Sequence, residues 1–169
     1  MQRISSLILG CSLVLTLEPA TEQAQHPCRL QGMTWKVSTN PLAYSALDKI
    51  PISVYRQGPV MSGQSGPEPA DGSKLKPGAF DLKIPSGAPI NVLFMDPSGQ
   101  LLPELQSLAA APEMQHTIHV TLLTVAQARE LKIDPYKHIQ SIISQLEAHG
   151  VTKDDKFMQQ LLMLLEKLG

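Results

Sequence analysis

Apolar and polar residues alternate in short stretches between positions 29 and 123, and this period of two predicts β-strands with one buried face. The clearest stretch is residues 79–84. Its apolar and charged side chains point to opposite sides: Phe80, Leu82 and Ile84 against Asp81 and Lys83. A Pro-Ser-Gly turn at 85–87 leads into a second strand, and another at 97–99 follows it. This segment therefore predicts a pair of β-strands.

Other stretches between the same limits also predict strands. They are residues 33–37, 50–56, 100–105 and 115–123. In the first, Trp35 falls on the apolar side and is predicted to face the core. Several short strands separated by turn signals predict an antiparallel β-sandwich, which we place at residues 25–123.

Residues 58–77 interrupt this pattern. They are rich in glycine, proline and serine and almost lack large apolar side chains. That composition predicts a long loop or an insertion without regular structure. A loop of this length is unusual inside a compact domain, so it is either functional or a tolerated insertion.

The period changes from 2 to 3.6 at Thr124, which predicts a helical extension over residues 124–169. Thr124 begins a capping box that opens a short first helix. Asp134 followed by proline marks the start of a second helix, and Thr152 is predicted to cap a third. The predicted fold class is thus mainly β, with a β-sandwich followed by two or three short helices.

The third helix carries a wider apolar arc than a lone surface helix needs. Two interpretations follow. The arc packs between the sandwich and the second helix, or it presents a surface to a protein partner or to a second copy of the chain. The candidate partner surface consists of Phe157, Leu161, Leu164, Leu165 and Leu168.

The first 24 residues predict a signal peptide and therefore export. Arg3 precedes an uncharged, mostly apolar run at 4–17, which is shorter than the roughly 20 residues of a membrane span. We expect no membrane span after cleavage, and a periplasmic or extracellular location. Cys11 lies inside the apolar run rather than at its end, so a lipid anchor at Cys11 is the less favoured alternative.

The remaining composition argues against several classes of function. Cys28 is the one cysteine after the predicted cleavage, so it is interpreted as a small buried residue or as a link between chains. A net charge of −1 without a basic stripe argues against nucleic-acid binding. His116 and His119 are three apart in a strand and cannot share one metal ion. Without a catalytic motif, we expect no enzyme activity, no cofactor and no metal site.

Several of the predicted strands resemble a known family. Ile-Pro-Ile-Ser-Val-Tyr-Arg at 50–56, Gly-Ala-Phe-Asp-Leu-Lys-Ile-Pro-Ser-Gly at 78–87 and Ile-Asn-Val-Leu-Phe-Met-Asp-Pro-Ser-Gly at 90–99 are similar to carboxypeptidase regulatory-like domains of exported bacterial proteins. The resemblance spans approximately residues 32–122. It implies a transthyretin-like β-sandwich with a hairpin after residue 78 and an accessory role, and it carries over no catalytic residue.

These features favour a non-catalytic exported module with a structural or protein-interaction role. The alternative is a carbohydrate-binding accessory module of the cell envelope. Exposed aromatic side chains would carry that alternative, and the available ones are Trp35, Tyr44 and Tyr55.

Overall fold

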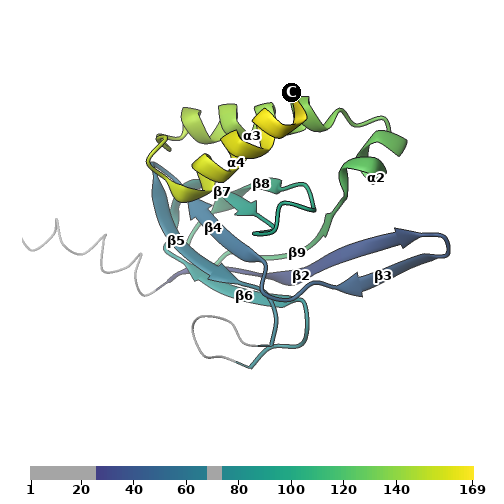
Figure 1. Cartoon of the computed structure of the whole chain (residues 1–169). Coiled ribbons are helices and arrows are strands. Elements are labelled where there is room, and N and C mark those ends of the chain that lie inside the picture. Colours follow the sequence, from purple (N-terminus) through teal and green to yellow (C-terminus); the bar gives the residue numbers. More distant parts are fainter. Residues whose placement is uncertain (1–25, 68–73) are drawn as a thin grey trace, which may run out of the picture.

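The computed structural model describes residues 26–67 and 74–169. It has three layers, namely two four-stranded β-sheets packed face to face and helices over the outer face of the second sheet (Figure 1). The predicted fold class, a mainly antiparallel β-sandwich followed by short helices, is confirmed. The predicted signal peptide, including Cys11, lies outside the described residues.

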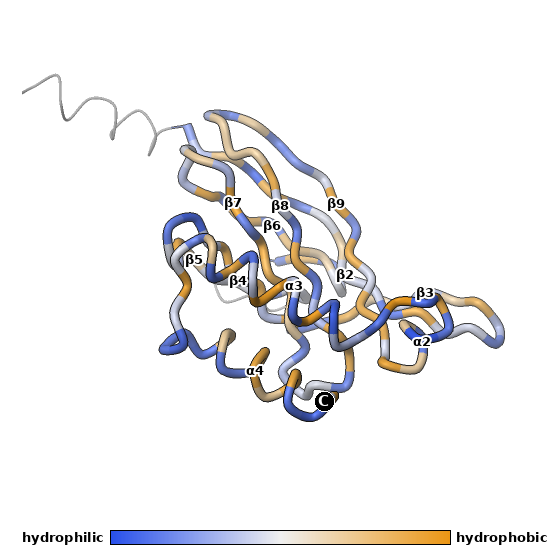
Figure 2. The backbone as a smooth tube through the Cα atoms, turned by 90° about the horizontal axis from the view of Figure 1, so that it is seen from above, coloured by the Kyte–Doolittle hydropathy of each residue, from blue (hydrophilic) through white to orange (hydrophobic). Residues whose placement is uncertain are grey.

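The first sheet is built around a long strand, β2 (Cys28–Thr39). β9 (Gln115–Leu122) runs parallel to it, and this pair is an exception to the antiparallel arrangement. β6 (Ala79–Ile84) and β3 (Leu42–Ala46) pair antiparallel with successive parts of β2. The end of β2 and most of β3, residues 37–44, extend beyond β9 and the sandwich as a hairpin arm (Figures 1 and 2).

The second sheet has the order β5 (Pro59–Gln64), β4 (Pro51–Tyr55), β7 (Gly87–Phe94) and β8 (Glu104–Ala110), with every pair antiparallel. β5 lies inside the segment 58–77, so the prediction that this segment lacks regular structure is wrong for its first part. Its side chains are mostly small or polar, but a strand ladder needs only backbone amides and carbonyls.

The turn at 85–87 connects the two sheets and does not close a hairpin. β6 pairs with β2 in the first sheet, whereas β7 pairs with β4 and β8 in the second. The hairpin expected after residue 78 is therefore not formed. Arg56 stabilises this connection from β6 to β7. Its Nε donates to the carbonyl of Ala88 (2.9 Å), and its Nη2 donates to the carbonyl of Pro85 (2.6 Å). Alternation predicts a strand, but it does not say which strand will be its neighbour.

Two hydrophobic cores lie on the two faces of the second sheet. The first fills the space between the sheets, where the rings of Phe80 and Phe94 lie 5.3 Å apart at 56°. The second lies between the sheet and the helices and includes Tyr55, Leu93 and Ile139. β7 contributes to both cores, so its residues from 90 to 94 are all buried.

The facing of β2 differs from the prediction by one residue. Leu30 and Thr34 face the core, so Trp35 lies on the outer face, and the prediction that Trp35 faces the core is wrong. A shift of one residue moves every side chain of a strand to the other face. Thr34 is tolerated in the core because its hydroxyl donates to the carbonyls of Leu47 (2.7 Å) and Gly78 (3.1 Å).

The helical extension comprises α2 (Val125–Glu130), α3 (Pro135–Ala148) and α4 (Lys156–Leu168). The capping box of α2 is confirmed. The amide of Gln127 donates to Thr124 Oγ1 (3.1 Å), and the amide of Thr124 donates to Gln127 Oε1 (3.0 Å). These reciprocal bonds fix the point at which the last strand becomes helical.

Asp134 caps α3 as predicted, and its carboxylate accepts from the amides of the first turn. For α4 the predicted cap is wrong. Asp155, three residues after Thr152, is the N-cap residue. Both residue types cap helices well, so the choice depends on the register at which α4 meets the sheet.

Candidate functional site

The apolar face of α4 packs mainly against its own domain. Leu161 is fully buried beside Met158 in the second core, so Leu161 is a core residue and its place in the predicted partner surface is wrong. The other members of that surface are half-buried against the same core: Phe157, Leu164, Leu165 and Leu168. Of the large apolar residues of α4, only Met163 is mostly exposed, at 60%.

Asp155 joins this helix to the second sheet. Its Oδ1 accepts from the amides of Phe157 (2.9 Å) and Met158 (3.1 Å) and from the Tyr55 hydroxyl (3.0 Å). Burial raises the pKa of Tyr55, so the phenol is neutral and acts as a donor. One carboxylate therefore both caps α4 and satisfies the buried hydroxyl of a core residue.

Trp35 and His119 form a flat pair of rings on the outer face of the first sheet. The indole Nε1 donates to His119 Nδ1 at 3.0 Å, the ring planes differ by 11°, and the centroids lie 6.2 Å apart. An indole N–H lies in the plane of its ring, so the imidazole stands beside the indole edge rather than over its face. The alternation of apolar Cys28 and Leu30 is the sequence signal that places Trp35 on this face.

Apolar side chains continue from this pair along the hairpin arm. Val37 is paired with Tyr44, and Thr39 with Leu42, so these residues share one face of the arm. Leu42 is 69% exposed and Tyr44 is 60% exposed. Single exposed apolar residues are common, but a row that runs from Trp35 to the end of an arm is a candidate interaction surface. We call Trp35, Val37, Leu42 and Tyr44 the arm surface.

Among the residues at 26–67 and 74–169, no three His, Cys, Asp or Glu side chains come together as a group that could hold a metal ion. His116 is register partner to Leu30 and His119 to Met33, which places the two imidazoles on opposite faces. Cys28 is buried in the first core, and burial raises the pKa of its thiol.

Glu104 and His138 connect the second sheet to α3. His138 Nε2 lies 2.8 Å from the carbonyl oxygen of Pro103 and 3.5 Å from Glu104 Oε1. The Glu104 side chain is only 28% exposed, and burial raises the pKa of its carboxyl, an effect that His138 partly offsets. Folding therefore makes ionisation of this carboxyl less favourable than it is in the unfolded chain.

We expect Glu104→Gln to stabilise the protein more at pH 8 than at pH 5. A carboxyl whose pKa is raised by folding binds its proton more tightly in the folded state, so its contribution to stability falls as pH rises through that folded pKa. The glutamine side chain does not titrate, so the variant does not lose this stability as pH rises. Urea unfolding at both pH values measures the difference. Glu113→Gln, at a carboxylate that is 73% exposed, is the control. A larger benefit at pH 5 would contradict the prediction.

No family model and no curated protein matches the sequence. The resemblance to carboxypeptidase regulatory-like domains thus rests on the strand and turn motifs alone. In the part of the chain that the structure describes, no helix has the length and apolar character needed to cross a bilayer.

Proposed function

We propose that this chain is a non-catalytic exported module that binds another protein, and that the arm surface makes the contact. The observation that supports this proposal is the row of apolar side chains on the hairpin arm. Figure 2 shows that the backbone of this hairpin extends beyond the sandwich. Leu42 and Tyr44 are exposed, whereas Phe157, Leu164, Leu165 and Leu168 of α4 are half-buried. Apolar and aromatic side chains of this kind supply the central contacts of protein interfaces.

The backbone of the arm is well supported, as a binding element requires. The Gln127 side chain of α2 donates to the carbonyl of Val37 at 2.5 Å, and Ser38 Oγ donates to the carbonyl of Pro41 at 3.1 Å. These bonds hold β2 and the turn beyond it, while the side chains of Leu42 and Tyr44 remain available. Little ordering of the arm would then be needed when a partner binds.

Photo-crosslinking in cells that naturally express the chain tests this proposal. A photoreactive phenylalanine analogue replaces Tyr44 in one variant, Leu165 in a second and Met163 in a third. We expect a discrete adduct with one other protein from position 44 and none from position 163, which is an equally exposed apolar site on α4. An adduct from position 165 alone would move the interface to the surface first predicted on α4. Absence of an adduct at 44 would contradict the arm surface.

Glycan binding is a second candidate function, and the Trp35–His119 pair favours it. Two nearly coplanar rings give a broad, flat surface, and aromatic faces of this kind suit the apolar face of a sugar ring. Thr117 and Thr121 lie on the same face of the sheet and offer hydroxyl groups beside the rings.

Fluorescence tests this second candidate directly, because Trp35 is the only tryptophan. We expect a saturable change in Trp35 emission with at least one member of a broad glycan panel, and a weaker apparent affinity in His119→Ala. An unchanged spectrum across the panel would contradict glycan binding at these rings.

A further inference from the structure

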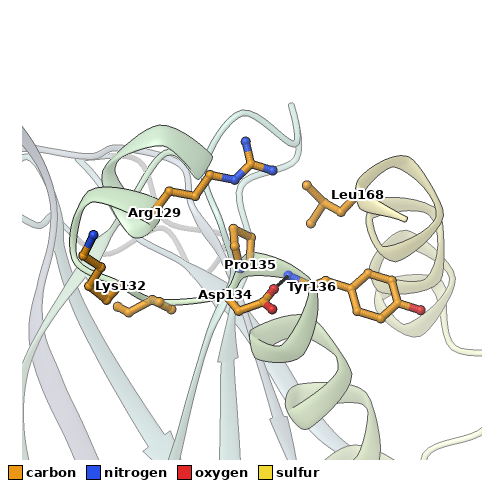
Figure 3. Close-up of a pocket in the computed structure, with 7 residues that line it drawn as sticks. Arg129, Lys132, Asp134, Pro135, Tyr136 and Leu168 are labelled. Carbon is orange, nitrogen blue, oxygen red and sulfur yellow. Dashed lines mark hydrogen bonds between the residues drawn. The ribbon is translucent and has the colours of Figure 1, made fainter.

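We propose that a pocket between the ends of the three helices binds a small anionic amphiphile, a carboxylate that carries a short apolar chain. The pocket has a volume of about 410 Å³, within the range of small-molecule sites. It lies where the end of α2, the start of α3 and the end of α4 meet (Figure 3). It shares no residue with the arm surface, so this inference is independent of the proposed protein partner.

Arg129 supplies the charge that would bind the carboxylate. Its guanidinium extends from α2 across the pocket towards Leu168, while Lys132 borders the opposite side (Figure 3). Among the described residues, neither side chain has an ion-pair partner. A guanidinium presents paired donors that match a carboxylate, and such charge-assisted hydrogen bonds are stronger than neutral ones.

The carboxylate of Asp134 also lines the pocket but is already engaged. Its Oδ1 accepts from the amides of Tyr136 (3.0 Å) and Lys137 (3.3 Å) at the start of α3. The bond to Tyr136 is drawn in Figure 3. Because Asp134 makes no ion pair with Arg129 or Lys132 in the described structure, both cations remain available to a ligand anion.

Apart from Tyr136, which also lines the pocket, the rest of the lining is apolar and would hold the chain of the ligand. Pro135 is buried, Leu168 is half-buried, and Ile133 is 39% exposed. A site with a cation at one edge and apolar side chains beside it favours an amphiphile over a free inorganic anion, because apolar burial adds to the charge interaction.

The test titrates the full chain with decanoate below its micelle concentration and follows backbone amide signals by NMR. We expect saturable shifts at residues 129–136. Decanoate should bind at least about threefold more tightly than hexanoate, because the added methylenes are partly buried. Decanol, which has the chain without the charge, and acetate, which has the charge without the chain, should both bind at least about tenfold more weakly than decanoate.

Matched variants locate the charge. Arg129→Gln should weaken decanoate binding at least about tenfold, and Arg129→Lys should weaken it less. Lys153→Gln removes one positive charge from an exposed site away from the pocket and should change the affinity less than twofold. Equal weakening by Arg129→Gln and Lys153→Gln would overturn the proposal, because it would show a response to net charge alone. Binding to anionic phosphatidylglycerol vesicles without any binding of monomeric decanoate would also overturn it.

Discussion

Replacing Gly32 with alanine is expected to lower the free energy of unfolding by at least about 4 kcal/mol, an effect at the far end of those seen for single substitutions. Gly32 lies in the middle of β2, between Phe80 of β6 and Ile118 of β9. A Cβ atom built on it would overlap the carbonyl oxygen of Ile118 and lie 2.9 Å from the Phe80 ring.

The expected effect is large because the new Cβ atom would overlap a backbone atom. The Ile118 oxygen belongs to the backbone, so it cannot rotate aside as the end of a side chain can. β9 would have to move away from β2, and the parallel ladder between the strands would be weakened along its length. A typical domain has only about 5–15 kcal/mol of stability in total, so this one substitution would remove a large part of it.

Gly63→Ala is the matched control. A Cβ atom there would meet only Leu82 Cδ2, at 2.8 Å, which is the end of a flexible side chain. We expect a change of less than about 1 kcal/mol, because the added strain is relieved by a small side-chain movement and alanine also reduces the entropy of the unfolded chain. Urea denaturation followed by circular dichroism measures both variants. If Gly32→Ala is as stable as Gly63→Ala, β9 does not approach β2 in the way described.

Asp155→Ala is the substitution with the second largest expected effect, a loss of about 2–4 kcal/mol. Two costs add. Loss of an N-cap side chain costs about 1 kcal/mol, and the buried Tyr55 hydroxyl is left without its partner in α4, which costs about 1–3 kcal/mol. Because α4 closes the second core through Met158 and Leu161, its first turn and that core should loosen together.

Two comparisons separate these costs. Asp134→Ala removes the same kind of cap from α3 but leaves no buried hydroxyl without its acceptor. It should therefore lower the free energy of unfolding by only about 1 kcal/mol. Tyr55→Phe removes the hydroxyl, and the double variant with Asp155→Ala should be more stable than the sum of the single effects predicts. Equal losses from Asp155→Ala and Asp134→Ala, or strict additivity in the double variant, would show that the Tyr55–Asp155 bond contributes little.

Sequence patterns alone did not predict which side chains of the candidate surfaces are exposed. The wide apolar arc of α4 was open to two interpretations, and the structure places Leu161 in the core, because the second sheet has an apolar outer face that α4 covers. Its alternation with polar neighbours predicts that Trp35 faces the core. The apolar residues Cys28 and Leu30 indicate the opposite facing, and the structure shows that β2 adopts it, with Leu30 and Thr34 in the core.

Short-range patterns in the sequence were enough to predict most of the local elements. Alternation identified most strands, and side-chain chemistry identified the capping box at Thr124 and the start of α3 after Asp134, because these signals depend on residues only a few positions apart. The remaining features were visible only in the tertiary structure. It set β6 and β7 in different sheets, added β5 as an edge strand, and chose Asp155 as the cap of α4. Those outcomes depend on which surfaces meet across long chain separations, and a local pattern does not record that.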